Sequence, residues 1–533
     1  MAERGYDYII VGGGSSGCVL ANRLSEDSSC RVLLLEAGGK DTHPFIHMPV
    51  GFAKMTTGPL TWGFTTEPQK NANDREIPYA QARVIGGGSS INAEVFTRGN
   101  PVDYDRWANE EGAEGWAFKD IQKYFLKSEG NTSLSGDWHG TDGELAVSNV
   151  PSPQPMTRAF AQSCQEFGIP HNHDFNGPVQ EGAGVYQITT RDGKRCSAAV
   201  GYLHPVMKRP NLTVLTKCLV HRLVIEKDRA VGVEFSQNGE TQTVQAESEV
   251  LLTAGAIGSP KLMMLSGIGP AAHLKDVGID VVQDLQGVGE NLNDHFGIDI
   301  VAELNGHYSL DKYNKPHWMV WAGAQYYLFK SGPVTSNVVE GGAFWYADKS
   351  NAVPDLQFHF LAGAGAEAGV PSVPKGSSGI TLNSYTLRPK ARGTVKLRSA
   401  DPAAMPIVDP NFLGHPDDLK TSVEGVKISK EIFSQPSLQK YIRKIRFPDD
   451  NVKTQKDFED YARQYGRTSY HPTCTCKMGV DEMAVVDPQL RVRGIEGLRI
   501  CDSSIMPSLV GSNTNAPTIM IGEKAADMIR GNK

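Results

Sequence analysis

The stretch that decides the fold runs from residue 6 to residue 17 and reads YDYIIVGGGSSG. Its first six residues are apolar enough for a strand buried on both faces, as in a parallel sheet. The glycines that follow have separate uses. Gly12 allows a tight turn, Gly14 lets the backbone approach a pyrophosphate, and Gly17 lets a helix pack closely on the strand. This order of strand, glycine loop and helix predicts a Rossmann-like dinucleotide-binding domain.

The next predicted strand strengthens this interpretation. Residues 31–36 read RVLLLE, and Glu36 follows Gly17 by 19 residues. A carboxylate at this place accepts hydrogen bonds from ribose hydroxyls and would repel a 2′-phosphate, which disfavours NADP. Free N–H groups at the start of the intervening helix, expected over residues 18–24, would bind the phosphates. These features alone leave NAD and FAD as alternatives.

Similar patterns return in the middle and at the end of the chain. Alternation over 212–235, an apolar run at 250–253 and a strand-to-helix pattern over 498–529 would complete the nucleotide-binding sheet. Alternating patterns between 354 and 407 predict an antiparallel sheet of different character. We therefore expect an α/β and α+β protein, in which a substrate domain built on an antiparallel sheet is inserted into a discontinuous Rossmann-like domain. The expected boundaries are 1–155, 205–305 and 460–533 for the cofactor domain, and 156–204 and 306–459 for the substrate domain.

Composition excludes several classes of protein. The 533 residues are 40% hydrophobic and 21% charged, which is typical of a globular chain with more than one packed region. The net charge of −7 argues against nucleic acid as a partner, and no apolar run approaches the roughly 18 residues of a membrane span. The start of the chain resembles no signal peptide and the eight cysteines are scattered, so we expect a cytoplasmic protein. Cys474 and Cys476 lack a second cysteine pair, which predicts buried thiols on a short strand and no metal.

Four ordered blocks resemble the glucose–methanol–choline (GMC) oxidoreductases over essentially the whole chain. They are RVIGGGSSIN at 83–92, GAIGSPKLMMLSGIG at 255–269, YHPTCTCKMG at 470–479 and NTNAPTIMIG at 513–522. The resemblance implies FAD as the cofactor and oxidation of an alcohol as the reaction. At finer grain, DTHP at 41–44, MTTGP at 55–59 and NAEVFTRG at 92–99 look like the L-sorbose dehydrogenases within this family.

The resemblance also implies which residues bind FAD. They are Gly12, Gly14, Ser15, Ser16, Gly17, Glu36, Trp62, Asn92, Ala93, Val95, Val220, Asp502 and Thr514. Some family members tether the flavin through a histidine, and the matching position here is Ile91, which has no nucleophilic ring nitrogen. We therefore expect FAD to be bound non-covalently.

Oxidation of an alcohol requires a base for the hydroxyl proton, and histidine suits this task near neutral pH. The chain has 14 histidines, so composition singles out none of them. The resemblance points to His471 ahead of His295 and His359. The family's second active-site position is His or Asn, and here it is Asn513. Its amide would orient the alcohol and stabilise the developing alkoxide, although Asn in such a loop is also an ordinary turn residue.

One predicted strand of the substrate domain carries a polar face. Residues 355–360 read DLQFHF, so alternation places Gln357 and His359 on the face opposite Leu356, Phe358 and Phe360. That polar face would look either toward the flavin pocket or into solvent.

Several functions stay open at this point. The leading hypothesis is FAD-dependent oxidation of a primary alcohol on a sugar or polyol, with L-sorbose as the best single substrate. The alternatives are the oxidation of choline, which needs a carboxylate or aromatic cage, oxidation of another alcohol, or a flavin-containing carbon–carbon lyase. The expected electron acceptor is a quinone, a dye or oxygen.

Overall fold

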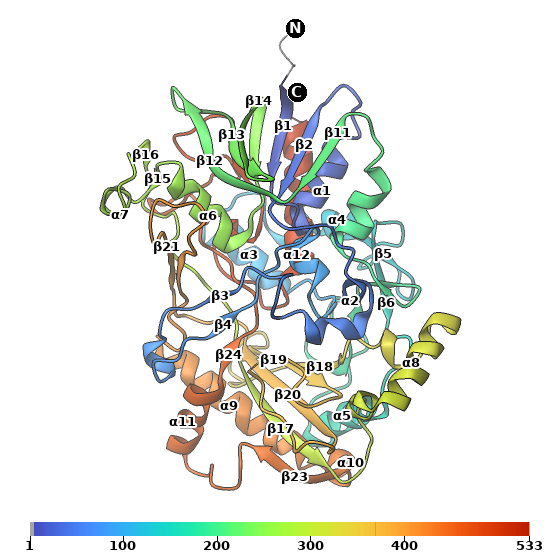
Figure 1. Ribbon diagram of the computed structural model, residues 1–533. Helices are drawn as coiled ribbons and strands as arrows, with labels where there is room; N and C mark the ends of the chain where they lie inside the picture. Colours follow the sequence, from blue (N-terminus) through green and yellow to red (C-terminus); the bar gives the residue numbers. More distant parts are fainter. Residues whose placement is uncertain (1–4, 368, 532–533) are drawn as a thin grey trace.

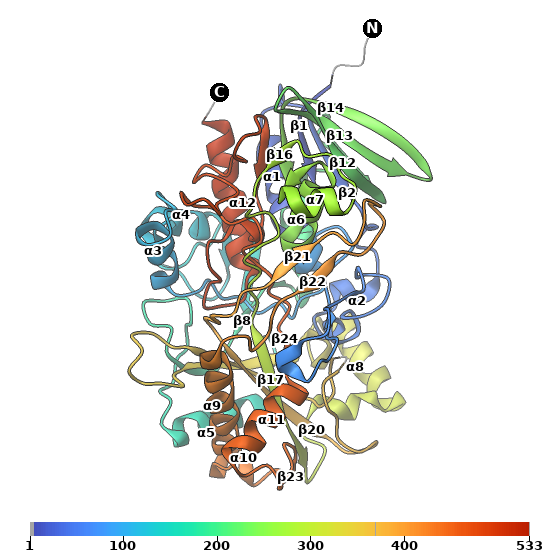
Figure 2. The ribbon, with the colours of Figure 1, turned by 90° about the vertical axis from the view of Figure 1, so that its left-hand side faces the viewer.

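The computed structural model describes residues 5–367 and 369–531 and is built around two large sheets of seven strands each. The first sheet occupies the upper half of Figure 1 and the second the lower half. Figure 2, turned by 90°, shows the same separation, with β1, β13 and β14 at one end of the molecule and β17, β20 and β23 at the other.

The first sheet confirms the Rossmann-like prediction. Its order is β11-β2-β1-β14-β13-β12, with β25 beside the end of β14. The strands are β1 (Tyr6–Val11), β2 (Val32–Glu36), β11 (Leu212–Thr216), β12 (Cys218–Glu226), β13 (Arg229–Gln237), β14 (Glu240–Leu252) and β25 (Leu498–Ile500). β11, β2, β1, β14 and β25 run parallel, whereas β12, β13 and β14 form an antiparallel meander. β2 is buried along its whole length, as expected for a parallel strand covered on both faces.

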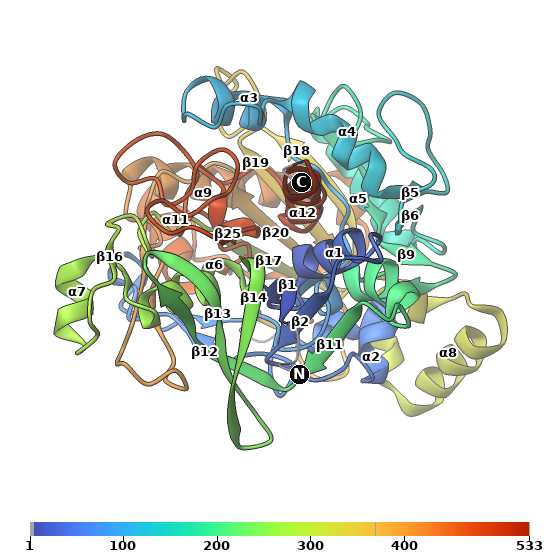
Figure 3. The same cartoon turned by 90° about the horizontal axis from the view of Figure 1, so that it is seen from above.

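Helix α1 (Ser15–Leu24) packs against β1 and β2, and it packs side by side with α12 (Asn515–Arg530), which also contacts α4 (Phe118–Ser128). Figure 3 shows α1 and α12 next to one another beside the first sheet. α1 begins directly after the glycine turn, three residues earlier than expected. A Cβ atom on Gly17 would lie 2.0 Å from the carbonyl oxygen of Gly12, so only glycine allows this close approach of helix and strand.

The second sheet is antiparallel, as predicted, with the order β23-β17-β20-β19-β18-β7 and β24 beside β17. Its strands are β7 (Gly182–Val185), β17 (Phe296–Leu304), β18 (Val339–Trp345), β19 (Leu356–Leu361), β20 (Gly379–Thr386), β23 (Ile442–Phe447) and β24 (Arg467–Thr468). Helices α5 (Pro155–Phe167) and α9 (Pro416–Phe433) pack against it, and α10 (Pro436–Gln439) and α11 (Gln455–Tyr465) pack against those helices.

Strand β19 has the predicted alternation. Leu356, Phe358 and Phe360 belong to the core that the sheet shares with α5 and α9. Gln357 is completely buried on the opposite face, and His359 lines a cavity there. The polar face therefore looks into the protein and not into solvent.

The division of the chain into two domains stays a proposal, and strand pairing bears on two of its boundaries. We expected residues up to 305 in the cofactor domain, but β17 pairs with β20 and β23 in the second sheet. β24, at 467–468, also pairs with β17. Strand pairing therefore favours placing residues 296–304 and 467–468 in the substrate domain, because their backbone hydrogen bonds are made to strands of the second sheet.

The remaining helices are short or lie outside the two sheets: α2 (Pro44–His47), α3 (Pro101–Asn109), α6 (Gly255–Leu265), α7 (Ala271–Asp276) and α8 (Pro316–Phe329). Smaller sheets are formed by β3 (Phe64–Thr65), β4 (Pro78–Tyr79), β5 (Glu129–Asn131), β6 (Leu145–Asn149), β8 (Gln187–Ile188), β9 (Thr190–Arg191), β10 (Lys194–Arg195), β15 (Ile268–Gly269), β16 (Gln283–Asp284), β21 (Thr394–Lys396) and β22 (Ile407–Asp409). Across the described residues, none of the helices is long and apolar enough to cross a membrane.

All eight cysteines are buried, and Cys474 and Cys476 form no disulfide. Cys474 and Cys476 are therefore buried thiols, as predicted, but the short strand expected around them is wrong. The segment is irregular, and the N–H groups of Cys474 and Cys476 donate to the carbonyl oxygens of Ser503 and Ser504.

Candidate active site

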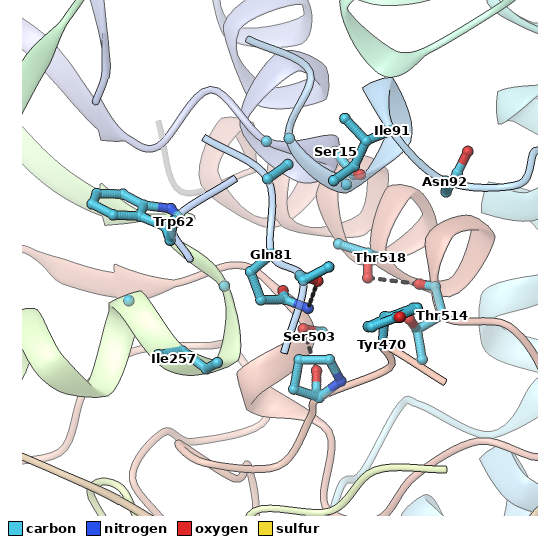
Figure 4. A pocket seen from close by; sticks show the side chains of 18 of the residues that line it. Ser15, Trp62, Gln81, Ile91, Asn92, Ile257, Tyr470, Ser503, Thr514 and Thr518 are labelled. Carbon is cyan, nitrogen blue, oxygen red and sulfur yellow. Dashed lines mark hydrogen bonds between the residues drawn. The ribbon is translucent and has the colours of Figure 1, made fainter. Parts of the chain in front are cut away.

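One cavity of about 350 Å³ is lined from both sheets. All predicted site residues except Gly17 line it, namely Gly12, Gly14, Ser15, Ser16, Glu36, Trp62, Asn92, Ala93, Val95, Val220, His471, Asp502, Asn513 and Thr514. Gly17 does not line the cavity; its lack of a side chain allows α1 to pack closely against the end of β1. Figure 4 shows Ser15, Ile91 and Asn92 along one side of this cavity, with Tyr470 and Ser503 across from them.

Two helices begin at this cavity. α1 starts at Ser15 and α12 at Asn515, and a hydrogen bond of 2.9 Å from Ser15 Oγ to Asn515 Oδ1 joins the two starting points. Neither helix has a side chain that caps its first N–H groups. Open N–H groups and the positive end of the helix dipole favour an anionic group, so this end of the cavity fits a pyrophosphate.

Glu36 ends β2 at the same part of the cavity. Its carboxylate accepts hydrogen bonds from the backbone N–H groups of Gly13, at 2.8 Å, and Gly38, at 2.6 Å. Burial raises the pKa of Glu36 to about 7. Each carboxylate oxygen keeps a further lone pair, so Glu36 is able to accept from ribose hydroxyls as well.

The segment around Ile91 has the properties expected for a non-covalent flavin site. Ile91 lines the cavity and is 7% exposed. Next to it, Asn92 Oδ1 accepts a hydrogen bond of 2.7 Å from Arg195 Nη1, and the buried Arg195 also donates to the carbonyl oxygen of Ser89. Arg195 thus fixes the loop on the side away from the cavity. On the cavity side, Ile91 provides an apolar wall without a nucleophile.

A contact between the rings of His471 and His295 lies at the part of the cavity where we expect the alcohol to react. Their Nδ1 atoms lie 3.0 Å apart, and Nε2 of His295 lies 3.0 Å from the carbonyl oxygen of Leu387. Because a carbonyl only accepts, His295 carries its proton on Nε2. Burial lowers the pKa of His295 well below its ordinary value, so the ring is neutral and its Nδ1 is an acceptor.

The protonation of His471 follows from this contact. Its Nδ1–H donates to Nδ1 of His295, and burial lowers the pKa of His471 to about 3. The other nitrogen, Nε2, therefore carries a lone pair, and it lies 3.3 Å from Nδ2 of Asn513 at the cavity. The ring thus presents a base to the cavity.

Asn513 is held in one orientation by two donors. Its Oδ1 accepts hydrogen bonds from Thr97 Oγ1, at 3.0 Å, and Gln357 Nε2, at 3.1 Å. Its Nδ2 must therefore point toward His471, where a substrate oxygen would also accept from it. Asn513 is 9% exposed and fixed by side chains from distant segments, so it is not an ordinary turn residue.

The segment just before β17 positions the loop that carries His471. Asp294 Oδ1 accepts a hydrogen bond of 2.8 Å from the backbone N–H of His471, and its Oδ2 accepts from Thr468 Oγ1. The carbonyl oxygen of His295 accepts from the backbone N–H of Ser469 at 2.8 Å. Asp294 therefore fixes the backbone of His471, while His295 fixes its ring.

His359 lies on the cavity side of β19. Its Nε2 lies 3.1 Å from Gln357 Nε2 and 3.3 Å from the hydroxyl oxygen of Tyr385, and because an amide nitrogen only donates, His359 Nε2 accepts from Gln357. Burial lowers the pKa of His359 to about 3. It is a second neutral imidazole in the wall, and its unprotonated nitrogen accepts from Gln357 at 3.1 Å, a shorter contact than the 3.3 Å between Asn513 and His471.

Comparisons with known proteins agree with this geometry. Residues 6–297 match the N-terminal profile, and residues 389–522 the C-terminal profile, of the family described as GMC oxidoreductase. The chain belongs to the GMC oxidoreductase family. It is thereby an FAD-containing oxidoreductase that acts on alcohol CH–OH groups, and its fold of cofactor domain and antiparallel substrate domain is that of the family.

This GMC oxidoreductase is similar to an alcohol dehydrogenase [acceptor] from Pseudomonas putida, with 44% identity over 98% of this chain and 95% of the relative. It is also similar to the mitochondrial choline dehydrogenase of Homo sapiens, with 42% identity over 99% of this chain and 90% of the relative. Among solved structures, pyridoxine 4-oxidase from Mesorbium loti has a TM-score of 0.89 at 29% identity, with 99% of both chains covered.

Sequence reasoning missed the residues that support the base and the amide. Thr97 and Asp294 were not among the predicted site residues, Gln357 was predicted only to share a polar strand face with His359, and His295 was ranked below His471 without a role of its own. Thr97 lies 416 positions from Asn513 along the chain. Polar side chains of this kind are common everywhere in the sequence, so only their position in the fold distinguishes them.

Proposed function

We propose that this GMC oxidoreductase oxidises a primary alcohol to an aldehyde, with His471 as the catalytic base and Asn513 as the group that orients the alcohol. The observation that carries the proposal is the unprotonated Nε2 of His471, which lies 3.3 Å from the amide nitrogen of Asn513 at the cavity that also fits a pyrophosphate. An alcohol oxygen that lies within hydrogen-bond distance of both groups would donate its proton to the ring and accept from the amide.

His471, Asn513 and His295 each have a separate role in the proposed reaction. Nε2 of His471 takes the hydroxyl proton, and Nδ2 of Asn513 stabilises the negative charge that develops on the substrate oxygen. The positive charge that arises on His471 is shared through Nδ1–H with the neutral ring of His295. FAD, when bound along Gly12–Gly17, Glu36 and Asn92, would supply the acceptor for the hydride that leaves the substrate carbon.

The cavity wall favours an uncharged alcohol with an apolar chain. Val339 and Leu361 line the cavity beside His359, and both are buried apolar side chains. A sugar would need hydrogen-bond partners for several hydroxyl groups at this place. The proposal of L-sorbose as substrate rests on three short sequence blocks, and the relatives described above carry the names of alcohol and choline dehydrogenases instead.

A second candidate substrate is choline, which is supported by an arrangement of charged side chains at the cavity. Glu367 and Arg467 line the cavity, and Arg467 pairs with Glu367 at 3.2 Å and with Asp299 at 2.8 Å. Two carboxylates thus face one guanidinium, which leaves an excess negative charge near the wall. The ring of Tyr470 lines the cavity beside them and offers a further favourable surface for a cation.

Rapid anaerobic mixing tests both proposals. The purified FAD-loaded protein is mixed with a straight-chain primary alcohol, with choline or with L-sorbose, and bleaching of the flavin absorbance is followed. We expect the straight-chain alcohol to bleach the flavin fastest. Bleaching by choline alone would favour the second candidate, and bleaching by none of the three would support a lyase. Turnover with a dye, a quinone analogue or oxygen then identifies the class of acceptor.

A further inference from the structure

Helix α8 turns an apolar face away from the protein. Val320, Trp321, Ala324, Tyr327 and Leu328 follow the i, i+1, i+4, i+7, i+8 spacing of one helix face, and all five are exposed. Val320 is 73% and Leu328 is 74% exposed. The side of the helix toward the protein holds the buried Ala322 and Tyr326. The helix is therefore apolar on the side where a surface helix is normally polar.

Figure 1 and Figure 3 both show α8 at the edge of the molecule, where no other labelled element covers its outer side. Its N-terminal half adds Trp318 and Met319 and its last residue is Phe329, all of them exposed. Contiguous apolar patches of this kind mark an interaction with another protein or with a membrane.

Both ends of α8 carry positive charge without a counter-ion. Lys312 and Lys315 precede the helix and Lys330 follows it, whereas residues 312–339 contain neither Asp nor Glu in a chain of net charge −7. Within the described residues, none of the three lysines pairs with a carboxylate. Lys312 and Lys330 instead lie 5.0 Å from the ring centroids of Tyr313 and Tyr326.

We propose that α8 docks the protein onto the surface of a lipid bilayer that contains anionic lipids. The outward side chains would enter the boundary of headgroups and acyl chains, and the lysines would meet lipid phosphates. Tryptophan and tyrosine prefer this boundary because their rings are apolar with one polar edge. With 14 residues, α8 is too short to span a bilayer, so it would lie in the plane of the surface.

The charges favour a bilayer over a second copy of the chain. A two-fold contact through α8 would bring three unpaired lysines from each copy together, and this segment supplies no carboxylate to neutralise them. An anionic bilayer neutralises all of them at once. The cytoplasmic leaflet carries such lipids, which is compatible with the predicted location of the protein.

Sedimentation with vesicles tests the proposal. The FAD-loaded full chain is mixed with vesicles of phosphatidylcholine alone or of equal parts phosphatidylcholine and phosphatidylglycerol, and the bound fraction is measured. We expect binding mainly to the anionic vesicles. The variant K312Q/K315Q/K330Q should bind about a hundredfold more weakly, at about fivefold per lysine. The variant V320Q/L328Q should bind at least about tenfold more weakly.

The variant V179Q/V480Q serves as the matched control, because Val179 and Val480 are also exposed valines but lie outside α8. It should bind like the wild type, and all variants should retain dye-coupled alcohol oxidation. No binding of the wild type to anionic vesicles, or an equal loss in the control variant, would overturn the proposal. So would a wild-type dimer, measured by light scattering, that V320Q/L328Q converts to monomer while vesicle binding is unchanged.

Discussion

The Nδ1 atoms of His295 and His471 lie 3.0 Å apart, and this contact determines which nitrogen of His471 faces the cavity. His295 is completely buried and donates from Nε2 to the carbonyl oxygen of Leu387, so it accepts at Nδ1. His471 then has its proton on Nδ1 and its lone pair on Nε2. His295 is thus a positioning residue, which acts on the substrate only through His471.

Replacement of His295 tests this role. His295→Leu removes the acceptor, so His471 is free to take the other tautomer, and we expect kcat to fall about 10- to 100-fold with little change in KM. His295→Asn offers an amide oxygen near the position of Nδ1 and should recover most of the loss. Steady-state kinetics with an alcohol and a dye measure both. If the two variants lose activity equally, His295 has only a structural role.

Removal of the base should stop the chemical step while the cofactor stays bound. For His471→Ala we expect flavin reduction by the alcohol to slow about 10²- to 10⁴-fold, the usual contribution of a positioned base. Stopped-flow absorbance measures this rate, and the flavin content of the purified variant is the control. Flavin reduction at the wild-type rate would refute the assignment of His471.

Asn513 should contribute through its amide N–H. In Asn513→Ala the developing charge on the substrate oxygen loses a donor, so we expect reduction of the flavin to slow about 10²-fold. Asn513→His keeps a donor at this position and should be faster than the alanine variant. The same stopped-flow measurement compares the two, and an alanine variant as fast as wild type would leave Asn513 without a catalytic role.

Gly17→Ala should disturb the cofactor site through the backbone. The added Cβ would lie 2.0 Å from the carbonyl oxygen of Gly12, so α1 must shift, at a cost of about 2–3 kcal/mol in the free energy of unfolding. We expect a lower Tm and a reduced FAD content. Gly323→Ala is the matched control, because an added Cβ there meets no atom within 4 Å, and its Tm should be unchanged or slightly higher.

The buried neutral histidines should make stability depend on pH. The pKa of His295 is held well below 6.5 in the folded protein, so below about pH 6.5 the unfolded chain binds one more proton at this residue. The stability that His295 contributes is complete above that pH and is lost as the pH falls. Glu36, with its raised pKa of about 7, acts in the opposite direction.

A variant isolates the contribution of His295 from those of the other groups. In His295→Asn the slope of the free energy of unfolding against pH, measured between about pH 4.5 and 5.5, should be smaller by about 1.4 kcal/mol per pH unit. Urea unfolding at each pH measures this slope. An identical slope in both proteins would show that His295 is protonated in the folded state.

Local patterns were sufficient for the cofactor half of the protein. The order of β1, glycine loop and α1, with Glu36 at the end of β2, lies within 31 consecutive residues, so spacing alone predicts their arrangement. The alternation in 355–360 also predicted correctly which side chains share a face of β19. It could not predict which face would be turned to the cavity, because that depends on where α5 and α9 pack.

The catalytic arrangement and the outward face of α8 were decided by tertiary structure alone. His295 and His471 are 176 positions apart and meet because β24 pairs with β17, whose register no local pattern specifies. α8 is apolar around its whole circumference, so its sequence would suit a buried helix equally well. Sequence by itself determined the glycine loop, the acidic end of β2 and the family, since these depend on neighbouring residues. Long-range packing decided the proton on His471 and the exposure of α8, because both depend on groups that only the folded chain brings together or leaves uncovered.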